Sequence, residues 1–126
     1  MIIGIGTDLC QISRMERLLK DDRFLQRYFT TEEQQHIRGR AAGAAASAAA
    51  CFAAKEAFVK ALGSGFSGIA PKEVSVVHDA AGAPGYLLRG EALARAQARG
   101  VVRTHLSLSH ERDLAVAFAV LEGTAP

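Results

Sequence analysis

The residues best suited to chemistry are an acid and a base inside an apolar, alanine-rich stretch, together with a second acid near the N-terminus. Glu56 and Lys60 are four positions apart in Phe52–Gly63, a spacing that puts both side chains on one face of a helix. Asp8 ends the apolar run Met1–Thr7. Two such carboxylates could converge on one Mg²⁺, which proteins usually hold with one or two carboxylates and substrate phosphates. The alternative from spacing alone is an ordinary helical ion pair between Glu56 and Lys60.

Two glycines precede Asp8 and raise the question of a nucleotide-binding loop. Gly4 and Gly6 are not followed by the third glycine and the ribose-binding acid that a dinucleotide site requires. We therefore do not expect a dinucleotide site. The glycines instead provide backbone room beside Asp8, either for close approach to a metal or phosphate or for packing between strands.

Basic residues gather in the first third of the chain, interleaved with apolar ones. They are Arg14, Arg17, Lys20, Arg23, Arg27, Arg38 and Arg40. The ordinary interpretation is an amphipathic helix pair with a solvated basic face, and the alternative is a docking surface for an acidic partner helix. The net charge of +2 is too small to indicate nucleic acid binding.

The elements that must position these residues follow from caps, turns and periodicity. Capping boxes at Ser13–Glu16 and Thr30–Glu33 predict two helix starts, and Gly63 predicts the end of a third helix that follows the alanine-rich tract Ala41–Ala50. The remaining predicted elements are strands Glu73–His78 and Gly85–Arg89, a helix Glu91–Arg99, and a hairpin of Thr104–Ser109 with Leu114–Leu121 around the turn His110–Asp113. The pattern predicts an α+β fold in one domain, residues 1–126.

Period two in the first hairpin strand places Leu106 and Leu108 on one face and His105, Ser107 and Ser109 on the other. His105 is then on a polar face, where a solvated histidine is the ordinary interpretation. We expect Cys10 and Cys51 to be buried free thiols. No apolar run is expected to reach membrane-spanning length and no signal peptide is expected, so the prediction is a cytoplasmic protein without membrane contact.

Four sequence blocks in a fixed order carry a resemblance to a known family. They are Gly4–Asp8 followed by Arg14, Phe29–Glu33, Phe52–Ala57 continuing to Lys60–Gly63, and His105–His110. Together they span almost all of the 126 residues. The chain resembles the holo-[acyl-carrier-protein] synthases, the small single-domain type of 4′-phosphopantetheinyl transferase.

The resemblance implies a fold of antiparallel strands packed with a long central helix. It also implies transfer of 4′-phosphopantetheine from coenzyme A to a serine of apo acyl carrier protein, an activity of fatty-acid biosynthesis, with release of adenosine 3′,5′-bisphosphate. Asp8 and Glu56 would hold Mg²⁺, with Asp8, Glu56 and Lys60 forming the catalytic set. The acceptor of the serine proton stays open between a metal-bound water, Lys60 and Glu56.

The same resemblance implies ligand and partner contacts. Lys60 and His105 would lie at the bound coenzyme A, and Lys55 could reach a phosphate, although a surface lysine is the simpler interpretation. Acyl carrier protein would dock near Arg14, and the protein would form homotrimers with active sites at subunit boundaries.

The chain departs from the family pattern at three places. Cys51 replaces a common arginine, Ala83 replaces the lysine of a Gly-Lys-Pro turn, and Ala41–Ala50 replaces a more basic stretch. These changes remove partners for the adenosine 3′-phosphate, for which Arg38 and Arg40 could compensate. Two other functions are open: a non-catalytic module that binds coenzyme A or the carrier, and a Mg²⁺-dependent phosphohydrolase.

Overall fold

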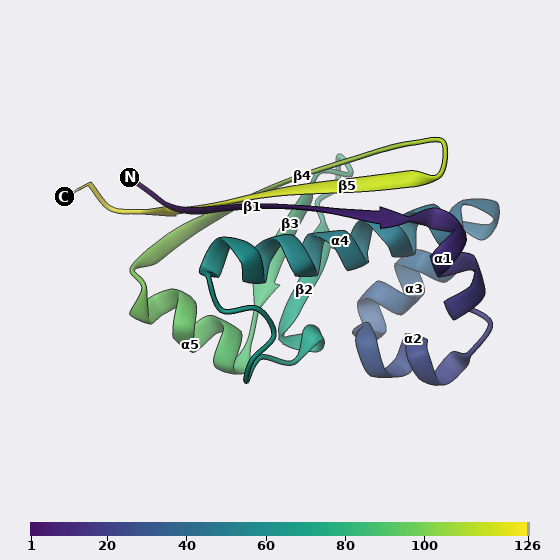
Figure 1. The fold of residues 1–126 in the computed structure, drawn as a ribbon, viewed down its shortest axis with the longest axis horizontal. Helices are drawn as coiled ribbons and strands as arrows, with labels where there is room; N and C mark the ends of the chain where they lie inside the picture. Colours follow the sequence, from purple (N-terminus) through teal and green to yellow (C-terminus); the bar gives the residue numbers. More distant parts are fainter. Residues whose placement is uncertain (126) are drawn as a thin grey trace.

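The computed structural model, which describes residues 1–125, has two antiparallel sheets arranged around one long helix (Figure 1). The first sheet has the strand order β1-β5-β4 and the second pairs β2 with β3. The elements in chain order are β1 (Ile2–Gln11), α1 (Ile12–Leu18), α2 (Asp22–Tyr28), α3 (Thr31–Gly39), η1 (Ala41–Gly43), α4 (Ala44–Leu62), η2 (Pro71–Glu73), β2 (Val74–His78), β3 (Pro84–Leu88), α5 (Gly90–Ala98), β4 (Val101–Glu111) and β5 (Leu114–Gly123). The predicted α+β class with antiparallel strands is confirmed.

Helix α4 lies along the inner face of the three-stranded sheet, and small residues allow this close approach (Figure 1). A Cβ added at Gly4 would overlap the carbonyl oxygen of Ala61, and one added at Gly6 would overlap that of Ala57. The glycines therefore bring β1 and α4 together, which places Asp8 next to the helix.

Helix ends show where local sequence signals hold and where a distant residue replaces them. The capping box at Thr30 is confirmed, since its hydroxyl accepts from the Glu33 amide while the Glu33 carboxylate accepts from the Thr30 amide. Gly63 ends α4 with φ of 81°, as predicted. The capping box at Ser13 is wrong: α1 begins at Ile12, and Asp113 of the hairpin turn accepts from both the amide and the hydroxyl of Ser13, at 2.8 Å each.

The strands fall where the sequence predicts them, but the long ones extend further. Asp8 does not end a strand, because pairing continues from Asp8 opposite Ala117 to Gln11 opposite Leu114. The hairpin turn is also tighter than predicted. β4 and β5 stay paired as far as Glu111 opposite Leu114, because polar side chains at the tip of a strand do not prevent backbone pairing.

The two faces of the first sheet differ in exposure. The inner face contacts α4 through Ala115, Ala117, Ala119 and Leu121 of β5, all fully buried. The outer face leaves large apolar side chains in solvent, with Ile5 62%, Leu9 62% and Phe118 46% exposed. This outer face, defined by β1, β5 and β4 residues that point away from α4, has no covering element within residues 1–125.

One helical segment, Ala41–Leu62, is long and apolar enough to cross a membrane by length and composition. The expectation that no stretch reaches this length is therefore wrong. However, 56% of its apolar 18-residue stretch is buried inside the protein. The core helix of a folded domain can have the same length and composition. The thiols of Cys10 and Cys51 are free and buried, as predicted.

Candidate active site

Lys60 joins helix α4 to strand β1 through Asp8. The Lys60 ammonium lies 2.9 Å from Asp8 Oδ1 and also donates to the Thr7 carbonyl at 3.2 Å. The helical ion pair between Glu56 and Lys60, the alternative from spacing, is not formed within residues 1–125. Lys60 and Asp8, 52 positions apart, therefore meet at one point.

The Glu56 carboxylate has a different partner, the phenol of Tyr28 at the end of α2. Tyr28 Oη donates to Glu56 Oε1 at 3.4 Å. Burial, followed by the negative charge of Glu56, raises the pKa of Tyr28 above its ordinary value, and the charges of Asp8 and Arg14 act on it in opposite directions. Both candidate carboxylates thus lie in the surroundings of one phenol.

These residues fit a Mg²⁺ ion. Asp8 and Glu56 each use one oxygen in the contacts above, so each has a second oxygen for a cation. A pair of carboxylates with no sulfur or imidazole is the donor set that Mg²⁺ prefers when substrate oxygens complete the shell. Within residues 1–125 no cluster of three or more His, Cys, Asp or Glu side chains forms, so the fit is to a two-carboxylate site.

Arg14 borders the same region from helix α1. Its guanidinium lies 5.2 Å from the centre of the Phe52 ring, a cation–π geometry. The side chain is exposed, and its charge acts on the nearby Tyr28 phenol and Cys10 thiol. The exposed basic group is therefore beside the carboxylates.

Lys55 does not lie at a surface, so both earlier interpretations of it are wrong. Its side chain is 0% exposed, and its ammonium donates to Glu33 Oε1 at 2.8 Å and to the carbonyls of Pro71 and Val74 at 2.9 Å each. Three acceptors occupy all three of its N–H groups. The thiol of Cys51, whose pKa burial raises, donates to the other Glu33 oxygen at 3.1 Å. Lys55 is thus a structural residue.

His105 lies on the outer face of the sheet, where it is exposed as period two predicted. Its Nε2 is 2.8 Å from Glu122 Oε1, and this contact is the main cause that lowers the pKa of Glu122. Asp8 pairs in register with Ala117 of the inner face. Within one chain, therefore, His105 and Asp8 lie on opposite faces of the sheet.

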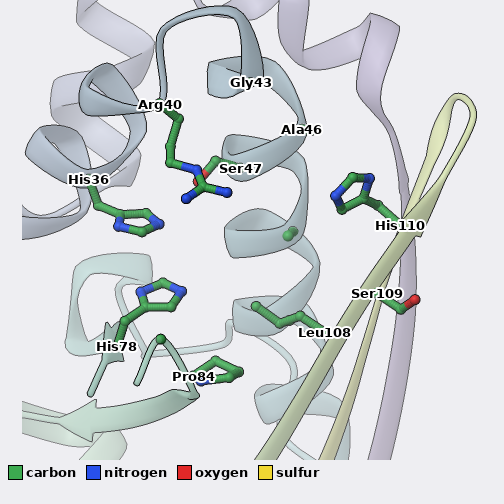
Figure 2. Close-up of a pocket in the computed structure, with 12 residues that line it drawn as sticks. His36, Arg40, Gly43, Ala46, Ser47, His78, Pro84, Leu108, Ser109 and His110 are labelled. Carbon is green, nitrogen blue, oxygen red and sulfur yellow. The ribbon is translucent and has the colours of Figure 1, made fainter. Parts of the chain in front are cut away.

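A pocket of about 420 Å³ lies between the end of α3, the start of α4, the β2–β3 turn and β4. Its lining includes His36, Arg40, His78 and His110 but no carboxylate. The rings of His36 and His78 stack with centres 4.1 Å apart, and Figure 2 shows the Arg40 guanidinium above them, directed into the pocket. Sequence reasoning named Arg40 but missed His36 and His78, because 42 positions separate this stacked pair and no local pattern links them.

Comparison with known proteins identifies the family of this chain. The 4′-phosphopantetheinyl transferase superfamily matches residues 4–119. The holo-[acyl-carrier-protein] synthase of Treponema denticola is 44% identical, over 98% of this chain and 100% of the relative. The crystal structure of the synthase from Neisseria meningitidis has 38% identity and a TM-score of 0.85, with 97% of this chain and 99% of that chain covered.

A synthase from Bacillus anthracis, solved in complex with CoA (3′,5′-ADP), has 32% identity and a TM-score of 0.81, with 98% of this chain and 99% of that chain covered. Similarity over almost the full length, in both sequence and structure, leaves no large part of the fold unmatched. This chain belongs to the 4′-phosphopantetheinyl transferase superfamily.

Proposed function

We propose that the protein is a holo-[acyl-carrier-protein] synthase, which transfers 4′-phosphopantetheine from coenzyme A to a serine of apo acyl carrier protein and releases adenosine 3′,5′-bisphosphate. The observation that supports this function most strongly is the ion pair between Lys60 and Asp8, which lies near Glu56 and Arg14. Relatives that match this chain over nearly their whole length are synthases of this type. We further propose that residues 1–126 act as one transferase domain in the cytoplasm.

Asp8 and Glu56 would hold Mg²⁺ through their second carboxylate oxygens. When bound, the ion would neutralise charge on the pyrophosphate oxygens of coenzyme A. Lys60, whose ammonium already contacts Asp8 and is about half exposed, would add a second positive charge at the transferring phosphoryl group. Phosphoryl transfer depends mainly on such positioning and charge neutralisation.

The basic pocket of Figure 2 is the candidate site for the phosphorylated ribose of coenzyme A. Arg40 and three histidines line it, and guanidinium and imidazole N–H groups suit a phosphate monoester. Arg38, the other compensating residue considered, pairs with Asp22 at 3.9 Å and does not line the pocket. We therefore assign the compensation for Cys51 and Ala83 to Arg40 and the histidines.

The carrier would dock on the exposed basic residues of α1 and α2, close to Arg14. Such a surface complements an acidic partner helix and would steer it by charge. Because Arg14 lies over the ring of Phe52 in α4, a carrier bound there would bring its serine close to Glu56, one turn further along that helix.

In a homotrimer, His105 of one subunit could lie close to Asp8 of another, although the two residues lie on opposite faces of the sheet within one chain. The outer sheet face carries exposed Ile5, Leu9 and Phe118, an apolar surface that a second copy of the chain could cover. If a neighbouring outer face lies against the Asp8 end of α4, then His105 of the partner subunit would approach the coenzyme. Each active site would then combine residues from two chains.

The deciding experiment measures the mass of apo acyl carrier protein after incubation with coenzyme A, Mg²⁺ and the protein. A 4′-phosphopantetheine mass increase is the expected result. Binding of both ligands without a mass change would instead favour a non-catalytic binding module. Release of adenosine bisphosphate without carrier protein would favour a phosphohydrolase.

A further inference from the structure

Tyr28 contacts α4, the helix that carries Glu56 and Lys60, through both its ring and its hydroxyl. It is the last residue of α2, and its phenol donates to Glu56 Oε1 at 3.4 Å. Its ring stacks on Phe52 of α4 with centres 5.0 Å apart and on Phe24 with centres 5.6 Å apart. The hydroxyl is thus presented to Glu56 from a ring held on both faces.

Two further rings hold the edges of Tyr28. Phe29 lies 5.6 Å away at 62° and Phe66 lies 6.4 Å away at 70°, both edge to face. Offset stacked and edge-to-face pairs are the preferred aromatic geometries. A ring enclosed in this way cannot swing away from Glu56 without breaking several contacts, so the position of the hydroxyl is determined by the fold.

The phenol can act on Glu56 only as a hydrogen-bond donor. A phenol keeps its proton at neutral pH, because its ordinary pKa is about 10. A carboxylate only accepts hydrogen bonds, so the phenol engages one lone pair of Oε1. The other oxygen, Oε2, makes no contact with the phenol and is the freer of the two for a cation.

We propose that Tyr28 is a positioning residue that orients the Glu56 carboxylate, so that Oε2 is presented to the metal ion shared with Asp8. This inference rests on the proposed function, and it adds a residue that sequence reasoning did not single out. Groups that hydrogen-bond a metal ligand from outside commonly change metal affinity by about 10- to 100-fold. The long bond of 3.4 Å places the expected effect near the lower end.

A purely structural role predicts a different result, and the chain supplies a matched control. The protein has two tyrosines, and both donate to α4. Tyr86 Oη donates to the Ala54 carbonyl at 2.5 Å, two positions before Glu56 in the same helix. Removing either hydroxyl deletes one oxygen and one hydrogen bond to α4, but only Tyr28→Phe removes a partner of a carboxylate.

The experiment titrates the wild type, Tyr28→Phe and Tyr86→Phe with Mn²⁺, a paramagnetic substitute for Mg²⁺, and measures free Mn²⁺ by electron paramagnetic resonance. We expect Tyr28→Phe to weaken Mn²⁺ binding about tenfold and Tyr86→Phe to leave it within twofold. In the transfer assay, Tyr28→Phe should raise the Mg²⁺ concentration for half-maximal rate by a similar factor. At saturating Mg²⁺ its KM for coenzyme A and carrier should stay near the wild-type values.

Equal Mn²⁺ affinity of Tyr28→Phe and the wild type would overturn the inference while leaving the proposed transferase intact. Equal weakening by both variants would also overturn it, because the effect would then come from loss of stability in α4. A wild-type protein that performs transfer yet binds no Mn²⁺ would overturn the inference together with the two-carboxylate metal site. Failure of transfer itself is read separately, from the mass of the carrier.

Discussion

Lys60 pairs with Asp8 on a neighbouring strand, at 2.9 Å, and not with Glu56 on its own helix. The Lys60 side chain is 54% exposed, and exposed ion pairs contribute only about 0–1 kcal/mol to stability. The pair therefore matters less for folding than for placing an ammonium against one carboxylate. Glu56 is left to a different donor, Tyr28, so the two acids have separate partners.

Removing either candidate metal ligand should stop transfer without unfolding the protein. Asp8→Asn and Glu56→Gln keep size and remove one negative charge each, so holo-carrier formation should be abolished. Lys60→Ala should lower turnover by about 10²- to 10³-fold, since it removes a charge that acts in the transition state. Mass spectrometry of the carrier across a Mg²⁺ titration provides the measurement. Full activity of Glu56→Gln at saturating Mg²⁺ would contradict the assignment.

Reversing the charge at Arg14 should weaken carrier docking specifically. Arg14→Glu is expected to raise KM for the carrier by about tenfold and to leave coenzyme A binding nearly unchanged. Wild-type activity should also weaken as salt rises, because exposed charges are screened. Lys72→Glu is a control with the same charge change at an exposed site in η2. Equal carrier kinetics for the two variants would place docking elsewhere.

The proposed assembly can be tested by mixing two inactive variants. Glu56→Gln and His105→Ala each damage a different contributor to a shared site, so mixed trimers should regain part of the activity through sites with intact Glu56 from one subunit and intact His105 from another. Activity after mixing and reassembly is compared with that of each variant alone. Sedimentation of the wild type as a stable monomer at micromolar concentration would contradict the trimer.

Lys55 should be required for stability more than for catalysis. Lys55→Met leaves the buried Glu33 carboxylate without its counter-ion, which should reduce the free energy of unfolding by about 3–5 kcal/mol. Urea unfolding gives the value. Adding Glu33→Gln should recover part of the loss, because it removes the unpaired buried charge. Its single amide oxygen can still accept from one of the two backbone amides that now bind separate Glu33 oxygens, Thr30 at Oε1 and Val76 at Oε2. No recovery in the double variant would show that charge is not the cause.

One pocket histidine, His78, should make stability depend on pH. Burial, then the charges of His36 and Arg40, lower the pKa of His78, while Asp79 opposes them, and the nearby Glu33 carboxylate is already bound to Lys55. The unfolded chain then binds more protons below about pH 6.5, so stability rises with pH through this window and is lost as pH falls toward the lowered pKa. His78→Gln should remove that part of the acid dependence, measured by urea unfolding across pH.

The same lowering of the His78 pKa gives a second readout in coenzyme binding. A phosphate bound in the pocket would favour protonated His78, so coenzyme A affinity should increase from about pH 8 to about pH 6. Calorimetric titration of the wild type and His78→Gln over that range tests this. An identical pH dependence for the two proteins would exclude His78 from phosphate binding.

Local signals predicted the elements well where both partners of an interaction lie close in sequence. The capping box at Thr30 and the glycine end of α4 at Gly63 are complete within a few residues, and both are confirmed. The capping box at Ser13 fails because Asp113, 100 positions away, supplies the acceptor. A capping box present in the local sequence thus does not form when a residue far away in the sequence binds the same backbone amide and hydroxyl.

The site could be predicted only in part for the same reason. Four-residue spacing suggested a bond between Glu56 and Lys60, but it carries no information about strand β1, which supplies Asp8 to Lys60 instead. Lys55 differs from a surface lysine only through Glu33 and two carbonyls that meet it in the fold. The partnership of Tyr28 with Glu56, 28 positions apart, likewise has no local signature.

Gly4 and Gly6, which allow β1 to lie against α4, also define how much mutation the active site can tolerate. Even the single methyl group of alanine would overlap a carbonyl oxygen of α4 at either position, and the strand that carries Asp8 would have to move away from Lys60. Gly39 and Gly85, by contrast, have open space where a Cβ would lie. Under laboratory selection for transfer activity, random substitutions should therefore accumulate at Gly39 and Gly85 while Gly4 and Gly6 stay unchanged.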